Sequence, residues 1–466
     1  MDVTGPNTAA ALDTQTGRTL WTWKRPIPAD YQSIGFGRVS RGPAILDDKL
    51  YVATLDCDLV ALDIKSGQER WSAKVADYKP GYSMTMAPLA IRGKVVVGIS
   101  GGEAGVRGFV DAYDAKTGRR AWRFWTIPGP GEPGHETWSG DAWKTGSGAT
   151  WVTGSYDPQL NLVYWGVDNP GPDWNGDSRP GDNLYTCSLV ALDGDTGAPR
   201  WHFQFTPHDT HDWDSTHGAG IVRSRDSRHQ TQAGGDCEPK RVLLRAGSRV
   251  RRISGREALC APNLGEEPGR SRPSDDESRN RTGGKRGAGL AELEWRDGVV
   301  QPGLPSRAGL FYVAVREKGA TYYKGEANYK PGTFFAGGGE QELPSDDAWG
   351  AIRALEATTG RMVWEFRLHS PPWAGVLSTA GGLVFSGSDE GNFFALDAKT
   401  GKPRWDFQTG GPIAANPISF TIDGRQHIAI AADRVLYVLV CSASLRPAVL
   451  AVMRSPFLLN QAFTRV

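Results

Sequence analysis

The segment Ala61-Leu62-Asp63-Ile64-Lys65-Ser66-Gly67-Gln68-Glu69-Arg70-Trp71 decides the fold, because near-copies of it recur along the chain. Its pattern is Ala-Leu-Asp-x-x-[Thr/Ser]-Gly followed by a tryptophan, with small variations. The acid and the tryptophan are eight residues apart in all six copies. The six pairs are Asp13 and Trp21, Asp63 and Trp71, Asp114 and Trp122, Asp193 and Trp201, Glu356 and Trp364, and Asp397 and Trp405. A repeat of this kind is typical of an array of similar structural units.

Each copy is interpreted as the turn of a β-hairpin. An apolar strand ends at Leu-Asp, the glycine supplies the positive φ of the turn, and the next strand begins near the tryptophan. Another strand pair precedes several copies, such as 49–53 with 59–62. Roughly four strands in about forty to fifty residues is the size of a propeller blade. We therefore predict an all-β propeller in which the recurrent tryptophan packs between neighbouring blades.

Composition agrees with many short strands and excludes several other classes. The 466 residues include 59 glycines and 17 tryptophans, and the net charge of +1 gives no reason to expect nucleic acid or an anionic membrane as a partner. The five cysteines form no C-x-x-C pair, so a zinc knuckle and a c-type haem site are not expected. The N-terminus lacks the basic and apolar regions of a signal peptide, and Val435–Val440 is too short to span a bilayer.

One long stretch departs from the blade pattern. Residues 223–307 are rich in Arg, Gly, Ser and Pro, and alternating apolar strands nearly vanish there. A disordered basic insertion is one explanation. A translated frameshift is the explanation we favour, because the stretch begins and ends inside what look like blade strands. We therefore divide the chain into blades carrying the site (1–222), a disrupted segment (223–307) with little regular structure, the remaining blades (308–440) and an off-pattern tail (441–466).

The densest chemistry lies at 206–214, Thr-Pro-His-Asp-Thr-His-Asp-Trp-Asp, which holds three carboxylates and two imidazoles. If this segment is extended, Asp212 and Asp214 project from the same face. Two close carboxylates repel each other unless a cation or a proton lies between them. The segment thus indicates a hard-metal site or a proton-shuttling pair, and an acidic surface turn is the simpler alternative.

Three other stretches carry residues suited to the same chemistry. Glu103 stands in the glycine-rich turn 99–108, and Asn169 lies in a tight loop before Pro170. Their oxygens, with those of Asp212, are ligands that a hard cation prefers. Trp151 follows the Gly-Ser-Gly-Ala-Thr segment and offers a flat surface for a flat cofactor.

Together these motifs resemble the quinoprotein alcohol dehydrogenases of the methanol and ethanol dehydrogenase type, which are eight-bladed propellers carrying pyrroloquinoline quinone (PQQ). The motifs are Gly-Glu-x-Gly-Val-Arg-Gly at 102–108, Asn-Pro-x-Pro at 169–172 followed by Arg-Pro-Gly-Asp-Asn at 179–183, and Thr-Pro-His-Asp-x-x-Asp at 206–212. The resemblance implies eight blades, with the first truncated and a middle one disrupted. It is strongest to the lanthanide-dependent branch, whose members resemble this chain in having Asp two positions after the catalytic Asp, here Asp214.

The resemblance also implies a role for each candidate residue. Asp212 would be the catalytic base. The metal ligands would be Glu103, Asn169, Asp212 and Asp214. The cofactor-binding residues would be Arg41, Thr85, Ser100, Gly101, Gly102, Trp151 and Trp373. The chain departs from the family at Gly35-Phe36, where many members carry two adjacent cysteines.

The implied activity is oxidation of a small primary alcohol to an aldehyde with PQQ and a bound Ca²⁺ or lanthanide(III) ion. Electrons would pass to a cytochrome c, the location would be periplasmic, and a homodimer is allowed. Two alternatives stay open. One is an inactive product of a damaged quinoprotein gene. The other is a non-enzymatic propeller scaffold of the outer-membrane assembly type, which has similar tryptophan repeats but lacks the metal ligands.

Overall fold

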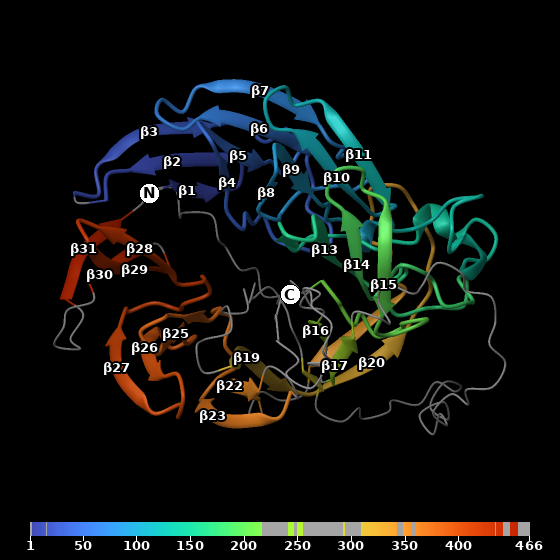
Figure 1. Cartoon of the computed structure of the whole chain (residues 1–466). Helices are drawn as coiled ribbons and strands as arrows, with labels where there is room; N and C mark the ends of the chain where they lie inside the picture. Colours follow the sequence, from blue (N-terminus) through green and yellow to red (C-terminus); the bar gives the residue numbers. More distant parts are fainter. Residues whose placement is uncertain are drawn as a thin grey trace, which may run out of the picture.

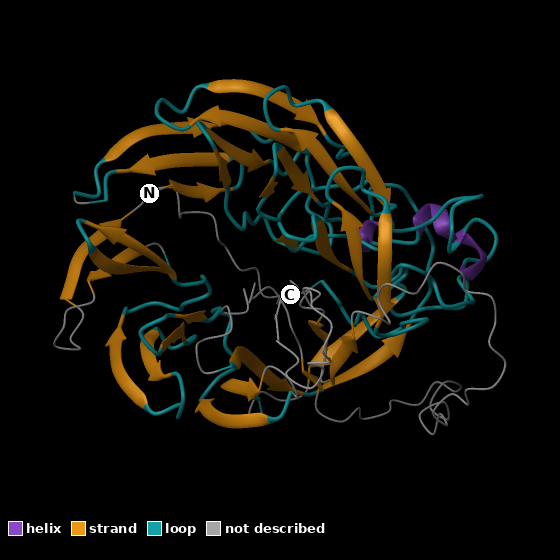
Figure 2. Ribbon diagram, viewed as in Figure 1, coloured by secondary structure: helices purple, strands orange, loops and turns teal. Residues whose placement is uncertain are grey.

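The computed structural model of the chain is a ring of antiparallel β-sheets with almost no helix (Figures 1 and 2). It describes residues 2–14, 16–216, 241–246, 249–254, 292–293, 309–342, 348–356, 360–433, 435–440 and 448–454. In these ranges the sheets follow one another around a common centre in chain order (Figure 1). The described helices are short 3₁₀ turns: η1 (Gly102–Ala104), η2 (His135–Thr137) and η3 (Ala142–Thr145).

The first half of the ring begins with a three-stranded sheet and continues with three four-stranded blades. The three-stranded sheet consists of β1 (Asp2–Gly5), β2 (Thr8–Leu12) and β3 (Thr19–Lys24). The blades consist of β4 (Ala44–Leu46), β5 (Lys49–Ala53), β6 (Asp58–Asp63) and β7 (Glu69–Lys74); of β8 (Leu89–Ile91), β9 (Lys94–Val97), β10 (Phe109–Asp114) and β11 (Arg120–Trp125); and of β12 (Ser155–Asp157), β13 (Leu162–Val167), β14 (Ser188–Asp193) and β15 (Pro199–Gln204).

The second half contains three more four-stranded blades and two separate hairpins. The blades consist of β18 (Glu292–Leu293), β19 (Leu310–Lys318), β22 (Trp349–Glu356) and β23 (Met362–Leu368); of β24 (Leu377–Ser378), β25 (Leu383–Gly387), β26 (Asn392–Asp397) and β27 (Pro403–Gln408); and of β28 (Ile418–Ile422), β29 (Arg425–Ala432), β30 (Val435–Val440) and β31 (Ala448–Arg454). The hairpins are β16 (Arg241–Ala246) with β17 (Arg249–Ser254), and β20 (Ala320–Lys324) with β21 (Gly338–Glu342).

The core lies between adjacent sheets, which explains why the inner strands are apolar on both faces. In β5 and β6, alternate residues pack toward opposite neighbours. Leu50 and Val60 contact the N-terminal sheet through Trp21, whereas Tyr51 and Leu59 belong to the cluster shared with the next blade. Residues of the outermost strand β7 are instead exposed or half-buried in alternation, because that strand forms the rim of the ring.

The recurrent tryptophans pack between blades, as predicted. Four of the six indoles donate a hydrogen bond to the carbonyl that follows the turn acid of the next blade, and their rings lie against the turn glycine there. The donor–acceptor pairs are Trp21 with Ile64 (3.1 Å), Trp71 with Ala115 (3.3 Å), Trp122 with Gly194 (3.3 Å) and Trp364 with Ala398 (3.1 Å). The matching glycines are Gly67, Gly118, Gly197 and Gly401. One joint therefore repeats around the ring.

Strand direction brings the predicted site residues to one end of the sheets. Because neighbouring strands of a blade are antiparallel, the ends of its second and fourth strands face the same way. Every predicted site residue lies in a loop that follows such a strand, or follows β3 of the N-terminal sheet. Isolated bridges between Ser83 and Ser100, and between Ser147 and both Arg107 and Pro170, tie several of these loops together.

The prediction of eight blades is wrong for the described residues, which form six four-stranded blades. The disrupted segment 223–307 lies largely outside the described residues; the hairpin β16–β17 and the two-residue β18 are its described parts. Part of the segment expected to be an off-pattern tail forms β31, which pairs with β30. Within the described part of the chain, none of the helices has the length and apolar character needed to cross a bilayer.

Candidate active site

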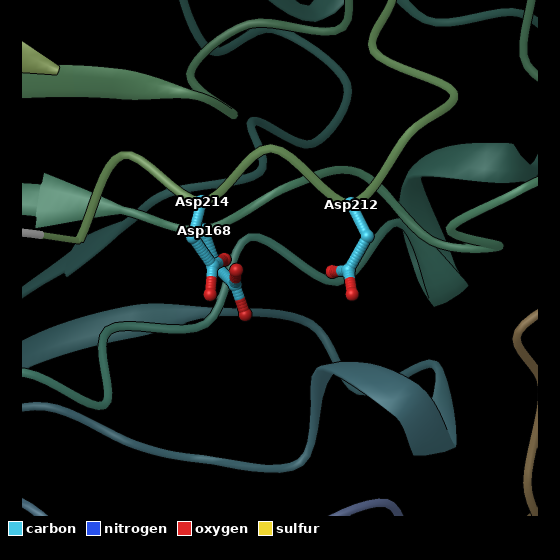
Figure 3. Close-up of side chains that lie close together, drawn as sticks. All are labelled: Asp168, Asp212 and Asp214. Atoms are coloured by element: carbon cyan, nitrogen blue, oxygen red, sulfur yellow. The ribbon is translucent and has the colours of Figure 1, made fainter. Parts of the chain in front are cut away.

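Three carboxylates gather at the predicted site. One oxygen from each of Asp168, Asp212 and Asp214 lies within 4.8 Å of the others. Figure 3 shows Asp212 and Asp214 hanging from the same side of one segment, with Asp168 entering from the neighbouring segment. The segment is not a regular strand, since Asp212 has a left-handed φ of 58°, a conformation that Asp tolerates better than most residues. Asp168 was not predicted to be part of the site.

A further buried carboxylate, Asp173, connects the other predicted ligands. The Asn169 amide Nδ2 donates a hydrogen bond to Asp173 Oδ1 at 2.9 Å. Burial raises the pKa of Asp173 well above its ordinary value, and the charges of Asp212 and Glu103 raise it further. The predicted ligands Glu103, Asn169 and Asp212 therefore all surround Asp173, although their joint coordination of an ion stays a prediction.

Close backbone approach makes room for these side chains. A Cβ on Gly35 would lie 2.6 Å from Glu103 Cδ, so the Glu103 side chain fits there because residue 35 has no side chain. Gly35 is one of the two positions at which the sequence departs from the pattern that the resemblance implies. A Cβ on Gly101 would lie 2.2 Å from the Gly81 carbonyl oxygen, which leaves no space for any other residue at that position.

The predicted cofactor residues fall into two groups. The hydroxyls of Thr85 and Ser100 are buried and 2.7 Å apart. Arg41 donates its backbone N–H to the Thr85 carbonyl at 3.1 Å, and its guanidinium carbon lies 4.7 Å from the centroid of the Trp151 ring. Trp373 instead lies under Arg316, with 3.6 Å between guanidinium carbon and ring centroid. A role for Trp373 in cofactor binding stays a prediction.

A buried arginine fixes the two acidic loops relative to each other. Arg179 donates from one terminal nitrogen to the Pro172 carbonyl at 2.9 Å and to the Asp209 carbonyl at 2.6 Å. Burial lowers the pKa of Arg179 to about 10, which leaves it charged at neutral pH. The Asp209 carboxylate accepts a hydrogen bond from the Trp213 N–H at 3.1 Å and so shapes the turn that carries Asp212.

The hairpin β20–β21, which comes much later in the chain, also reaches the site, and the sequence did not indicate this. The loop joining β20 to β21 donates the Phe335 N–H to the Glu103 carbonyl at 2.7 Å. The Ala336 carbonyl accepts the Trp174 N–H at 2.9 Å. Asn175 donates its side-chain amide to the Gly325 carbonyl at 2.9 Å. This loop therefore ties together η1 and the 169–175 loop.

The donor set suits both a hard cation and a planar anionic cofactor. Crowded carboxylates with an amide oxygen beside them are typical of sites for hard, oxygen-binding ions. The guanidinium of Arg41 lies over the Trp151 ring, and the Thr85 and Ser100 hydroxyls pair with each other. An aromatic ring, a cation and hydroxyl donors suit a flat cofactor that bears carboxylates. The residues present thus fit the ion and the quinone that the resemblance implies.

Comparison with known proteins places the chain in a family. Residues 3–233 match the family described as glucose/ethanol/alcohol dehydrogenase, beta-propeller domain. The quinoprotein alcohol dehydrogenase PedH of Pseudomonas putida is 35% identical over 451 residues, covering 90% of this chain and 74% of that relative. The chain belongs to the PQQ-dependent alcohol dehydrogenase family. Members of this family are oxidoreductases that act on alcohols.

Other relatives and solved structures of this family agree. A lanthanide-dependent methanol dehydrogenase of Methylacidiphilum fumariolicum is 34% identical, covering 91% of this chain and 74% of that relative. A europium-containing methanol dehydrogenase superposes with a TM-score of 0.73 at 30% identity, over 92% of this chain and 80% of that one. The quinohemoprotein alcohol dehydrogenase ADHIIG of Pseudomonas putida superposes with a TM-score of 0.77 at 31% identity, over 92% and 68%.

The later blades also match a second family. Residues 348–440 match the family described as outer membrane protein assembly factor BamB. This match covers blades without the acidic loops, whereas the alcohol dehydrogenase family match at 3–233 includes those loops. The likeness to the assembly factor thus reflects shared blade construction.

Proposed function

We propose that this protein oxidises small primary alcohols to aldehydes with PQQ and a bound lanthanide(III) or Ca²⁺ ion. The observation that carries the proposal is the gathering of Asp168, Asp212 and Asp214 within 4.8 Å of one another, beside Glu103 and Asn169. When bound, PQQ would supply a hydride acceptor for the alcohol carbon, and the ion would supply a Lewis acid beside it.

The chain's own residues hold the substrate's proton and the cofactor. Asp212 accepts the hydroxyl proton of the alcohol as the hydride leaves its carbon. Glu103, Asn169, Asp212 and Asp214 would bind the ion. Arg41 would pair with a cofactor oxygen, Trp151 would stack on its ring, and Thr85 and Ser100 would donate to its carboxylates. Gly101 and Gly102 would allow the backbone to approach the cofactor, and Trp373 would line the site from a later blade.

The trivalent ion is favoured over Ca²⁺. An ion of about the same size but higher charge needs more negative charge around it, and Asp214 supplies a carboxylate on the same side as Asp212. The relatives include lanthanide-dependent methanol dehydrogenases, which supports this choice. Family resemblance further supports a cytochrome c as electron acceptor and a periplasmic location.

The test is reconstitution of the purified chain with PQQ and either Ca²⁺, La³⁺ or Ce³⁺, followed by alcohol-dependent reduction of an artificial dye. We expect activity with the lanthanides. Asp212→Asn should lower kcat by at least about 100-fold, because the proton acceptor is lost. Asp214→Ala should abolish the lanthanide-dependent activity. Full activity with Ca²⁺ and none with lanthanides would refute the choice of ion. A folded chain inactive with every ion would support the damaged-gene alternative.

A further inference from the structure

Asp168 is the member of the acidic group that nothing in the sequence singled out. It follows β13 directly and is 6% exposed. Its backbone is fixed by two neighbouring segments: its N–H donates to the Ala149 carbonyl at 2.9 Å, and its carbonyl accepts the Cys187 N–H at 2.8 Å. Its carboxylate is thus presented to Asp212 and Asp214 from a rigid position, and does not swing in from a free surface loop.

A second, independent feature points at the same place. The Ser147 side chain is fully buried, and its Oγ has no hydrogen-bond partner among the described residues. A Cβ on Gly102 would lie 2.6 Å from Ser147 Oγ and 3.1 Å from Asp168 Oδ2. Both oxygens therefore converge on the space that the missing side chain of Gly102 leaves. A buried hydroxyl without a partner is costly and calls for a ligand or a water molecule.

The charge at this position also requires compensation. Asp168 Oδ1 accepts the Asn169 N–H at 2.9 Å, while Oδ2 is the atom directed toward Gly102. Within the described ranges, Asp168 makes no ion pair with a lysine or arginine. Three carboxylates so close together repel one another strongly in a partly buried site, and a bound cation removes that repulsion.

We propose that Asp168 is a direct ligand of the metal ion, an assignment that rests on the proposed function and extends it. Asp168, Asp212 and Asp214 then supply three carboxylates to one ion, and Glu103 and Asn169 complete the oxygen shell. With Asp168 included, the site carries one more negative charge than the predicted set of four ligands. This added charge strengthens binding of a trivalent ion more than binding of Ca²⁺.

The experiment measures binding of Eu³⁺, added as the chloride, to the full chain, in parallel for the wild type, Asp168→Asn, Asp168→Ala and Asp141→Asn. The last variant removes an exposed carboxylate paired with Lys144 and serves as a control for net charge. Europium luminescence gives the affinity, and its lifetimes in H₂O and D₂O give the number of bound waters. We expect Asp168→Asn to bind about 10- to 100-fold more weakly. Asp168→Ala should bind more weakly still and gain about one bound water.

Thermal unfolding separates ligation from a structural role. If Asp168 is a ligand, Asp168→Asn relieves repulsion, so the ion-free variant melts at or above the wild-type temperature while the rise on adding Eu³⁺ shrinks. A merely structural aspartate would instead lower the melting temperature without the ion.

The outcomes also separate this assignment from the proposed function. If the wild type binds Eu³⁺ and the Asp168 variants bind it equally with unchanged water number, the assignment is wrong and the proposed function stands. If binding depends on Asp168 but no alcohol is oxidised, the assignment stands and the enzymatic proposal fails. A wild type that binds no Eu³⁺ refutes both.

Discussion

At the scale of single residues, Asp173 fixes the orientation of the Asn169 amide, and thereby which end of it would face the proposed ion. Because Asn169 Nδ2 donates to Asp173, the amide oxygen is turned away from that carboxylate and is free to act as a ligand. Partners of this kind orient metal ligands, and their loss typically weakens metal binding. Asp173 is thus a positioning residue, which acts through Asn169.

We expect Asp173→Ala to weaken Eu³⁺ binding about 10- to 100-fold, because the amide of Asn169 loses the group that orients it. Asp177→Asn is the matched control, since Asp177 lies in the same loop but is exposed and paired with Lys324. The measurement is a luminescence titration of each purified variant. Equal affinities for the two variants would show that Asp173 does not orient the ligand.

The site residues that lie together in one short segment could be predicted from the sequence. The site residues that are brought together by packing of distant loops could not. Asp212 and Asp214 are two residues apart, and the shared side expected of an extended segment is present, although Asp212 has a left-handed φ. Asp168 and Asp173 flank Asn169 in a stretch that looks like a turn, where Asp and Asn are ordinary. Their burial depends on loops of neighbouring blades, and no local pattern encodes that.

At the scale of elements, the turn glycine is the part of each joint that cannot vary. Gly197 has φ 71°, and a Cβ there would lie 2.5 Å from the Trp122 ring. Gly424 has a similar φ of 74°, yet a Cβ there would meet nothing within 4 Å. Comparing the two positions separates the cost of the left-handed backbone from the cost of displacing the indole.

Gly424→Ala should lower the free energy of unfolding by about 1–2 kcal/mol, the cost of placing a Cβ in the left-handed region. Gly197→Ala should lower it by about 1–3 kcal/mol more, because the indole must shift as well. Denaturant unfolding of both variants provides the measurement. Similar losses at both sites would mean that the indole adapts without cost.

The same turns make the blades sensitive to acid. A hydrogen bond from Arg200 and further bonds from Thr196 and nearby backbone lower the pKa of Asp193 to about 2. Arg404 and Thr400 do the same for Asp397, whose pKa is also about 2. An aspartate in the unfolded chain has a pKa of about 3.9. The ionised turns therefore stabilise the fold fully above that value, and the contribution is lost as the pH falls toward 2.

We expect the melting temperature to fall between about pH 4 and pH 2, and to fall less steeply in Asp397→Asn, which has no carboxylate to protonate. The measurement is thermal unfolding across that interval by circular dichroism. Lys402→Ala, a neighbouring change that keeps the carboxylate, serves as the control. Identical slopes for the wild type and Asp397→Asn would contradict this account.

The hairpin β20–β21 and its contacts with the site could not be predicted from the sequence. The blade turns follow a repeated pattern, and the tryptophan joints could therefore be foreseen. The hairpin is an insertion between the second and third strands of its blade, outside the repeat. Its loop contacts Glu103 and Trp174 through backbone groups, which leave no mark in the sequence.

At the scale of the whole molecule, the first and last sheets meet. Leu12 at the end of β2 packs against Ala429, Leu436 and Val438 of the final blade. Figure 1 shows the N-terminal sheet beside β28 and β29. The contact is apolar, so closure of the ring rests on burial of these side chains.

Leu12→Ala should destabilise the closure by about 1–3 kcal/mol, since a partly buried leucine is truncated. The effect should be seen far away in sequence, as faster hydrogen exchange in β29 and β30. Leu20→Ala, a change in the same sheet at a side chain that is 55% exposed, is the control. Unchanged exchange in the last blade would show that the two sheets are held together by other contacts.

The number of blades was predicted incorrectly, because it was taken from the family resemblance. Six copies of the turn motif are visible, and the resemblance raised the expectation to eight, whereas the described residues form six four-stranded blades. The correspondence between copies and blades is not one to one. The copy at Asp13 belongs to the three-stranded sheet, and the last blade has no copy at all. Strand pairing depends on partners distant in sequence, which a local motif does not report.

The tryptophan joint also has a polarity. At the four tryptophan joints, the indole of one sheet points into the turn of the next, so the two faces of these sheets are different and complementary. Contacts of this head-to-tail kind end only when the series closes on itself. A molecule whose ring is opened at one of these tryptophan joints would expose a donor face at one end and an acceptor face at the other. Opened copies would then add to one another in linear polymers without a fixed length, and not as symmetric pairs.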